Sequence, residues 1–142
     1  MTEKEFIQKF IEEFQKEELK KFPDNFLENT ECKVVHIPNK ILIIGENFFD
    51  NYVVSTIDGN IVYNASTYEE AKYIVYASRN KTDKVAIPKD YHKMKLVLIN
   101  YEKYIDSIIF RISSEYEKHF SNQNNLNNII NDIMRILNLV RY

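Results

Sequence analysis

The sequence predicts an α+β fold: a small antiparallel sheet of two hairpins, with room for one or two further strands, joined by helices. Apolar residues recur at helical spacing near both ends of the chain, whereas short β-branched runs separated by turn residues occupy its middle. The 142 residues, 44% of them hydrophobic, suffice for one hydrophobic core. We therefore expect a single α+β domain over residues 1–142, with an N-terminal helix, a crossing helix and a C-terminal helical hairpin.

The first helix is predicted from its start signal. Thr2 and Glu5 have the spacing of a capping box, in which the threonine side chain accepts a hydrogen bond from the backbone three residues on. Apolar residues then follow at helical intervals: Phe6, Ile7, Phe10, Ile11 and Phe14. We expect this helix to end near Lys21, before Pro23.

Two hairpins are predicted in the middle of the chain. Residues 33–37 and 40–44 are β-branched runs separated by Pro38-Asn39, a pair that favours a turn. Residues 52–57 and 60–63 are separated by Asp58-Gly59, which suits a two-residue type I′ turn.

A second capping box, Thr67 to Glu70, predicts the crossing helix over residues 68–79. Residues 85–87 form a short apolar run that stops at Pro88, as a strand would. Residues 95–99 fit either a strand or the first turns of the next helix, because consecutive apolar residues set no period. We favour a strand there.

The C-terminal region predicts two helices, over residues 101–120 and 126–140, joined by a short Asn-rich loop that should make them antiparallel neighbours. The last helix also carries Met134, Ile136 and Leu139 outside its main apolar stripe. Such a helix is either sandwiched within its own chain or pairs with a partner, which would allow a homodimer through the C-terminal helix. We favour the sandwiched arrangement.

Composition excludes several classes of protein. The single cysteine, Cys32, cannot form an internal disulfide, and the charged start of the chain lacks an export signal, so we expect a cytoplasmic protein. The longest apolar run, Ile41 to Ile44, is too short to cross a membrane. The net charge is −2 and the basic residues form no stripe, so we expect no nucleic-acid partner.

One arrangement of charged residues resembles the signature of metal-dependent nucleases. Pro23-Asp24 is followed by Glu31 and Lys33, and in such sites two carboxylates hold the cation while the lysine helps to activate water. No apolar strand lies between Asp24 and Glu31 to carry the aspartate into a sheet. We therefore keep a nuclease or hydrolase only as the least favoured alternative.

Other catalytic and cofactor patterns are lacking. Cys32 and His36 would lie roughly 13 Å apart along a strand, too far to act as a pair. His92 and His119 have no companions at metal-ligand spacing. The two glycines, Gly45 and Gly59, cannot form a phosphate-binding loop. We expect no enzymatic activity, no metal and no cofactor.

The aromatic content is high, with ten tyrosines and nine phenylalanines, and tyrosine is favoured at protein interfaces. Two adjacent phenylalanines stand between acidic residues in the connection between the hairpins, where they could anchor a partner with a basic surface. The alternative is that both rings are tucked under the sheet. The predicted partner-binding residues are Glu46, Phe48, Phe49, Asp50 and Tyr52.

Together these observations favour a non-enzymatic protein-binding domain. The most specific form of this hypothesis is a bacterial inhibitor or toxin-immunity protein that neutralises a partner protein. The main alternative is a homo-oligomeric structural or regulatory domain that pairs through its last helix.

Overall fold

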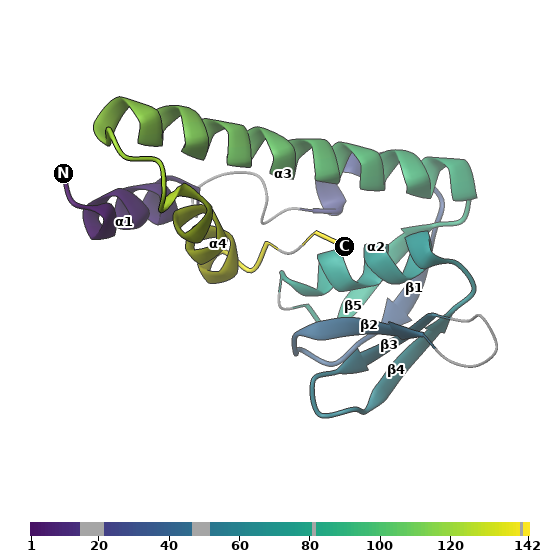
Figure 1. Ribbon diagram of the computed structural model, residues 1–142. Coiled ribbons are helices and arrows are strands. Elements are labelled where there is room, and N and C mark those ends of the chain that lie inside the picture. Colours follow the sequence, from purple (N-terminus) through teal and green to yellow (C-terminus); the bar gives the residue numbers. More distant parts are fainter. Residues whose placement is uncertain (15–21, 47–51, 81, 140) are drawn as a thin grey trace. The chain divides into compact units, whose positions relative to one another are not determined.

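The structure is a computed structural model that describes residues 1–14, 22–46, 52–80, 82–139 and 141–142 (Figure 1). The described residues form four α-helices, one 3-10 helix and five strands, which confirms the α+β class. In chain order the elements are α1 (Glu3–Phe14), η2 (Asp24–Phe26), β1 (Cys32–His36), β2 (Leu42–Glu46), β3 (Tyr52–Thr56), β4 (Ile61–Ala65), α2 (Tyr68–Ser78), β5 (Lys84–Pro88), α3 (Tyr91–His119) and α4 (Leu126–Ile136).

The described residues divide into two compact units. The helical unit contains α1, the part of α3 from Tyr101 onward, and α4. The sheet unit contains η2, all five described strands, α2 and the part of α3 up to Asn100. The expectation of a single domain stays a prediction. No helix in the described part of the chain is long and apolar enough to span a membrane.

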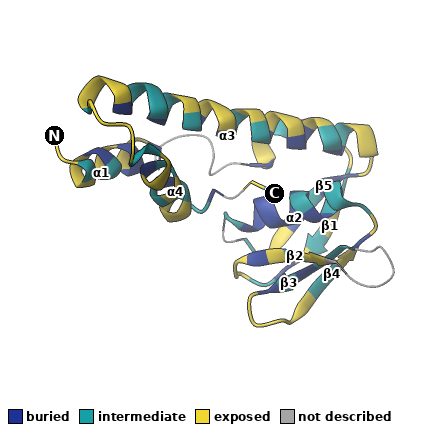
Figure 2. Cartoon of the chain, viewed as in Figure 1, coloured by how far each residue is buried: buried dark blue, intermediate teal, exposed yellow. Residues whose placement is uncertain are grey.

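The sheet unit is built on two antiparallel sheets. Strands β1 and β5 form a two-stranded sheet, and the other described strands form a three-stranded sheet in the order β2-β3-β4. Helix α2 packs against β2, β3, β4 and β5 and so covers a face of both sheets. Figure 2 shows the buried residues of α2 as an almost continuous dark face. The helix buries Ala71, Tyr73, Ile74, Val75, Tyr76, Ala77 and Ser78.

The first predicted hairpin is wrong, although both of its strands exist. Strand β1 pairs with β5 instead of β2, in a register that places Val35 opposite Val85 and Lys33 opposite Ile87. Val85 and Ile87 are buried. Strand β5 therefore contributes the apolar residues that this sheet needs on its inner side. The turn signal at Pro38-Asn39 could not reveal this partner, because β5 lies about fifty residues further along the chain.

The second predicted hairpin is confirmed, but its turn differs from the prediction. Strands β3 and β4 are antiparallel, with an irregularity between Val54 and Ser55. A type I′ turn requires positive φ at both central residues. Among the described residues of this turn only Gly59 has a positive φ, of 93°, and its N–H donates to the Thr56 carbonyl over 3.0 Å. The connection is thus a longer turn that closes on a left-handed glycine.

Helix α2 begins where its capping box predicted. The backbone N–H of Glu70 donates to the Thr67 hydroxyl oxygen over 3.2 Å. On the buried face, the Tyr73 hydroxyl donates to the Ala86 carbonyl of β5 over 2.8 Å, and burial raises the pKa of Tyr73. This bond fastens α2 to the two-stranded sheet.

The strand predicted at residues 95–99 is wrong, because these residues lie inside α3. The Asp90 carboxylate accepts from the backbone N–H groups of His92 over 2.8 Å and Lys93 over 3.1 Å, and so caps the helix before this run begins. Within the run Val97 and Leu98 are buried while Leu96 and Ile99 are exposed. That pattern follows the helical period and not the two-residue period of a strand.

The helical unit has an aromatic core. The Phe6 ring lies 4.8 Å from Phe10 and meets Tyr116 of α3 edge-on at 5.6 Å. The carboxylate of Glu3 accepts from the Tyr116 hydroxyl and from the Asn125 side-chain amide, each over 2.8 Å. The predicted cap of α1 is confirmed, because the N–H of Glu5 donates to Thr2 over 3.1 Å. The predicted end near Lys21 lies outside the described residues.

Helix α4 buries Ile129 and Ile133, as its stripe predicted. Its closest backbone packing is with α1, and not with α3, the neighbour that the sequence predicted. Of the apolar residues outside the stripe, Leu139 is buried, Met134 is half-buried and Ile136 is exposed.

Candidate functional site

The predicted partner-binding segment lies at the connection between β2 and β3. Phe48, Phe49 and Asp50 lie outside the described residues. Glu46 is the last residue of β2 and pairs with Tyr52 across the sheet, but its side chain is likewise not described. The structure therefore places the two strands that flank this connection. The role of Phe48 and Phe49 in partner binding stays a prediction.

Tyr52, the one predicted residue whose side chain is described, belongs to an aromatic pair. Its ring centre lies 5.3 Å from that of Tyr68, the first residue of α2, and the ring is half-buried. The Lys72 ammonium lies 5.2 Å from the centre of the Tyr68 ring, a cation–π distance. Tyr52 is thus anchored to α2 while part of its ring stays accessible.

The outer face of the three-stranded sheet, opposite α2, was missed by the sequence prediction. In the antiparallel register Ile43 lies opposite Ser55, and Ser55 lies opposite Ile61. Residues in one such row share a face. Leu42 and Val54, which neighbour this row along the strands, are fully buried on the other face. Ile43 and Ile61 are exposed, Ile61 to 66%.

Two further isoleucines lie at the same end of this sheet. Ile41 precedes β2 and Ile57 follows β3, and they are brought to one end because Leu42 pairs with Thr56. Ile57 is 71% exposed. We call these four exposed residues of the described sheet the isoleucine patch: Ile41, Ile43, Ile57 and Ile61. Figure 2 shows exposed residues on both edge strands, β2 and β4.

The rim of the patch carries charge of both signs, from Lys40 and Asp58. The Thr56 hydroxyl donates to the Asp58 carboxylate, and this bond is the main reason why the pKa of Asp58 lies below its ordinary value. Asp58 therefore stays ionised at neutral pH. An apolar centre with an ionised rim is the usual anatomy of a protein-binding surface.

The signal for this patch was available in the sequence, in the unbroken apolar run of residues 41–44. A strand with one covered face buries every second residue, so an unbroken apolar run must place isoleucines on the uncovered face as well. The sequence could not show that α2 covers only one side.

A second cluster links the two sheets around Lys33. Its ammonium donates to the Tyr63 hydroxyl over 3.3 Å and lies 3.5 Å from a carboxylate oxygen of Glu70. Partial burial would lower the pKa of Lys33, but the bond to Tyr63 and the charge of Glu70 outweigh it, so this pKa is raised. Burial raises the pKa of Tyr63 as well.

These pKa directions indicate what the cluster can do chemically. A general base or nucleophile at Lys33 would need a lowered pKa, whereas the raised value keeps the ammonium protonated at neutral pH. Tyr63 likewise keeps its proton. The cluster is suited to joining β1, β4 and α2 electrostatically and not to proton transfer.

The residues of the nuclease-like signature have different partners in the structure. Lys33 contacts Tyr63 and Glu70, whereas Glu31 forms an ion pair with Lys89 at 3.0 Å. Asp24 lies in η2, and within the described ranges no three His, Cys, Asp or Glu side chains come together as a group that could hold a metal ion. A site of two carboxylates and a lysine, as predicted from Asp24, Glu31 and Lys33, stays a prediction.

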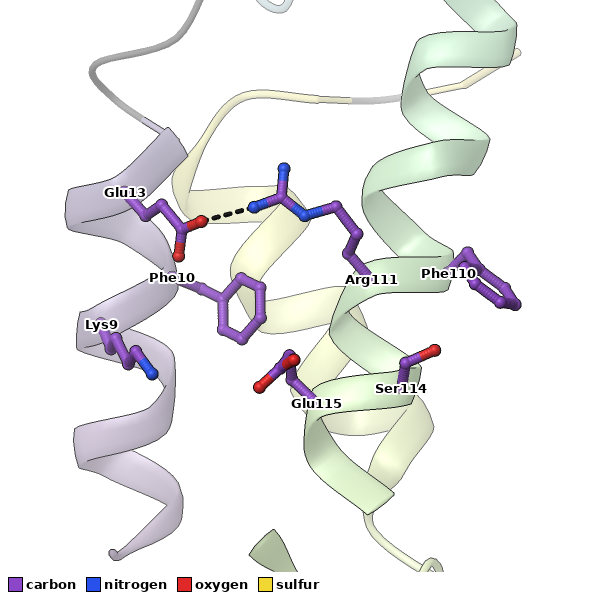
Figure 3. A pocket seen from close by; sticks show the side chains of 7 residues that line it. All are labelled: Lys9, Phe10, Glu13, Phe110, Arg111, Ser114 and Glu115. Carbon is purple, nitrogen blue, oxygen red and sulfur yellow. Dashed lines mark hydrogen bonds and ion pairs between the residues drawn. The ribbon is translucent and has the colours of Figure 1, made fainter. Parts of the chain in front are cut away.

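The helical unit contains a hollow of about 310 Å³ between α1 and α3 (Figure 3). The Phe10 ring stands between the two helices, and Glu13 pairs with Arg111 across the hollow. The pKa of Glu115, which also lines the hollow, is lowered mainly by the hydrogen bond and charge of Lys118, and to a smaller extent by the charge of Lys9. Because opposite charges already face one another here, the hollow has the character of a solvated seam between helices.

Comparison of the chain with protein-family models, with curated proteins and with solved structures found no significant match. The functional assignment therefore depends on the surfaces described above.

Proposed function

We propose that this chain is a non-enzymatic protein-binding domain, and that the isoleucine patch is the centre of its binding surface. The observation that carries the proposal is the exposure of Ile43 and Ile61 on one row of a sheet whose opposite face buries Leu42 and Val54. Contiguous exposed apolar residues with a polar rim are characteristic of interaction sites.

The predicted connection between β2 and β3 would form a second, separate contact at the other end of this sheet, because the Tyr52 ring packs against α2 and not on the outer face. Glu46, Phe48, Phe49 and Asp50 would supply aromatic anchors with an acidic rim, next to the partly accessible ring of Tyr52. Their charge suits a partner with a basic surface. The most specific form of the proposal is a bacterial inhibitor or toxin-immunity protein that neutralises its partner.

Site-specific photocrosslinking tests the proposal. A photoreactive phenylalanine analogue is introduced at Ile43 or Ile61, and, as a matched control, at Ile136, an exposed isoleucine of the helical unit. After irradiation in the source cells, we expect one covalent adduct at both patch positions that the control position lacks. Mass spectrometry of the adduct names the partner.

Reconstitution with the identified partner then separates binding from inhibition. Hot-spot residues cost more than about 1 kcal/mol of binding when truncated, so the double variant I43S/I61S should bind at least roughly tenfold more weakly. Loss of the partner's activity at a stoichiometric ratio would support the inhibitor form. Equal crosslinking at all three positions, or unchanged affinity of I43S/I61S, would contradict the proposal that the isoleucine patch is the centre of the binding surface.

A further inference from the structure

The part of α3 in the helical unit exposes a large aromatic side chain. Phe110 is 72% exposed, and Figure 3 shows it projecting from α3 on the side away from α1. Core residues of the same helix, such as Ile108 and Ile112, are buried. Phe110 is therefore not part of the packing of α3 within its own unit.

Two oppositely charged residues flank Phe110 symmetrically. Lys103 lies seven residues before it and Glu117 seven residues after it, and both are exposed. Seven residues are nearly two helical turns, so each side chain lies on the face of Phe110, roughly 10 Å away along the axis. This face therefore presents a cation, an aromatic ring and an anion at equal spacing.

The order of Lys103, Phe110 and Glu117 along α3 is complementary to the same three residues of a second copy that runs in the opposite direction. If a second copy of α3 lies antiparallel, with a two-fold axis through Phe110, Lys103 of one copy faces Glu117 of the other on both sides of the ring. A parallel arrangement would place like charges together, which is unfavourable. Asp106, also on this face, would lie opposite Ser114, and its own charge is already paired with Arg141. The antiparallel arrangement thus places no like charges directly opposite one another among these residues.

We propose that two copies of this chain pair through this face, α3 against α3 and antiparallel, with Phe110 on the two-fold axis. The proposal is independent of the protein-binding function proposed above, because it uses the helical unit and not the isoleucine patch. It also assigns the homodimer to α3, whereas the sequence suggested the C-terminal helix. A single helix pair buries less area than a standard interface, so the dimer should depend strongly on concentration.

Sedimentation equilibrium over a concentration series tests the pairing with charge-swap variants. K103E places carboxylates opposite one another on both sides of the axis, and E117K does the same with ammonium groups. Each single variant should weaken the dimer by about tenfold or more, whereas the double variant K103E/E117K restores the opposite pairs and should return to within about threefold of the original. F110S should abolish the dimer. Circular dichroism checks that each variant is folded.

Cysteine crosslinking supplies a second, geometric readout. In a background carrying C32S, a cysteine at Phe110 should form a disulfide between two copies, because the axis brings the two positions together. The same change at Ile136, exposed on α4, is the matched control and tests the C-terminal helix as interface.

Four results would overturn the proposal. One is a monomer at every concentration, and the second is a dimer that F110S leaves unchanged. The third is efficient crosslinking at Ile136 with none at Phe110, which would move the interface to α4. Failure of the double charge swap to restore association would overturn the antiparallel arrangement.

Discussion

The Lys33 ammonium donates to the Tyr63 hydroxyl over 3.3 Å and thereby joins strand β1 of the two-stranded sheet to strand β4 of the three-stranded sheet. No ladder hydrogen bonds join the two sheets in the described residues. The contact is completed by Glu70 of α2, which approaches the same ammonium to 3.5 Å. Side-chain contacts of Lys33 thus link the two sheets where the described residues form no ladder hydrogen bonds. Mutation of Lys33 tests how much these contacts stabilise the fold.

Replacing Lys33 with Met should lower the free energy of unfolding at pH 7 by about 0.5–1 kcal/mol, a small value because the side chain is 44% exposed. The folded-state pKa of Lys33 is raised, so its contribution is fully present below the unfolded pKa and is lost as pH rises through the folded value. Urea unfolding should therefore show the difference from the original protein shrinking above about pH 10.5. K84M, at an exposed lysine of β5, is the control.

Replacing Gly59 with Ala should destabilise the sheet unit by roughly 1–2 kcal/mol, because φ there is +93° and the left-handed region disfavours a Cβ. A Cβ at either Gly59 or Gly45 would meet nothing within 4 Å. G45A, which shares this open space without a positive φ, should change stability by less than about 0.5 kcal/mol. Equal losses in thermal unfolding of the two variants would show that the turn conformation is not the cause.

Replacing Asp90 with Ala should cost about 1 kcal/mol, because the carboxylate caps α3 by accepting from His92 and Lys93. Asp90→Asn retains an acceptor and should recover most of this loss. Chemical unfolding of the three proteins measures the difference. A deficit that persists in the Asn variant would point to the charge of Asp90 and not to its capping bond.

Adjacent residues of β2 should respond oppositely to mutation. Ile43→Ser should lower stability by about 1 kcal/mol or less, since its side chain is 38% exposed, whereas Leu42→Ala should cost about 2–5 kcal/mol, since Leu42 is fully buried. Urea denaturation measures both. A large loss in Ile43→Ser would mean that the outer face of this sheet is packed, and would remove the basis for the isoleucine patch.

Replacing Phe48, Phe49 or Asp50 with Ala should abolish capture of the identified partner while leaving the thermal midpoint nearly unchanged, if the connection binds a partner as predicted. Titration calorimetry with the purified partner and a thermal melt of each variant make the two measurements. Intact binding together with a clear fall in the midpoint would instead place the phenylalanines in the core.

Prediction succeeded where structure is set by nearby residues. The caps at Thr2 and Thr67 form as their spacing predicted, and each accepts from the backbone three residues on. The hairpin of β3 and β4 forms as well, because Asp58-Gly59 places its turn. These features depend on bonds within four residues, so sequence spacing predicts where they form, although not the type of the β3–β4 turn.

Prediction failed where a distant segment decides the outcome. Strand β1 pairs with β5, and the exposed isoleucines on the outer face of the three-stranded sheet were not predicted. Ile43 and Leu42 are both large apolar residues of the same strand. Their burial differs because α2 covers only one side of the sheet. Residues 95–99 are a different case, because the helix that contains them is started locally by Asp90, a cap that the sequence analysis did not use.

The sequence by itself determined which segments are helical or extended in most of the chain, since capping, turn residues and apolar period act over a few residues. Only the tertiary structure decided which strands pair, which face of the sheet stays open and where Phe110 and the isoleucines become exposed. The physical reason is that burial is a property of packed elements: whether an apolar side chain loses water depends on what another part of the chain brings against it.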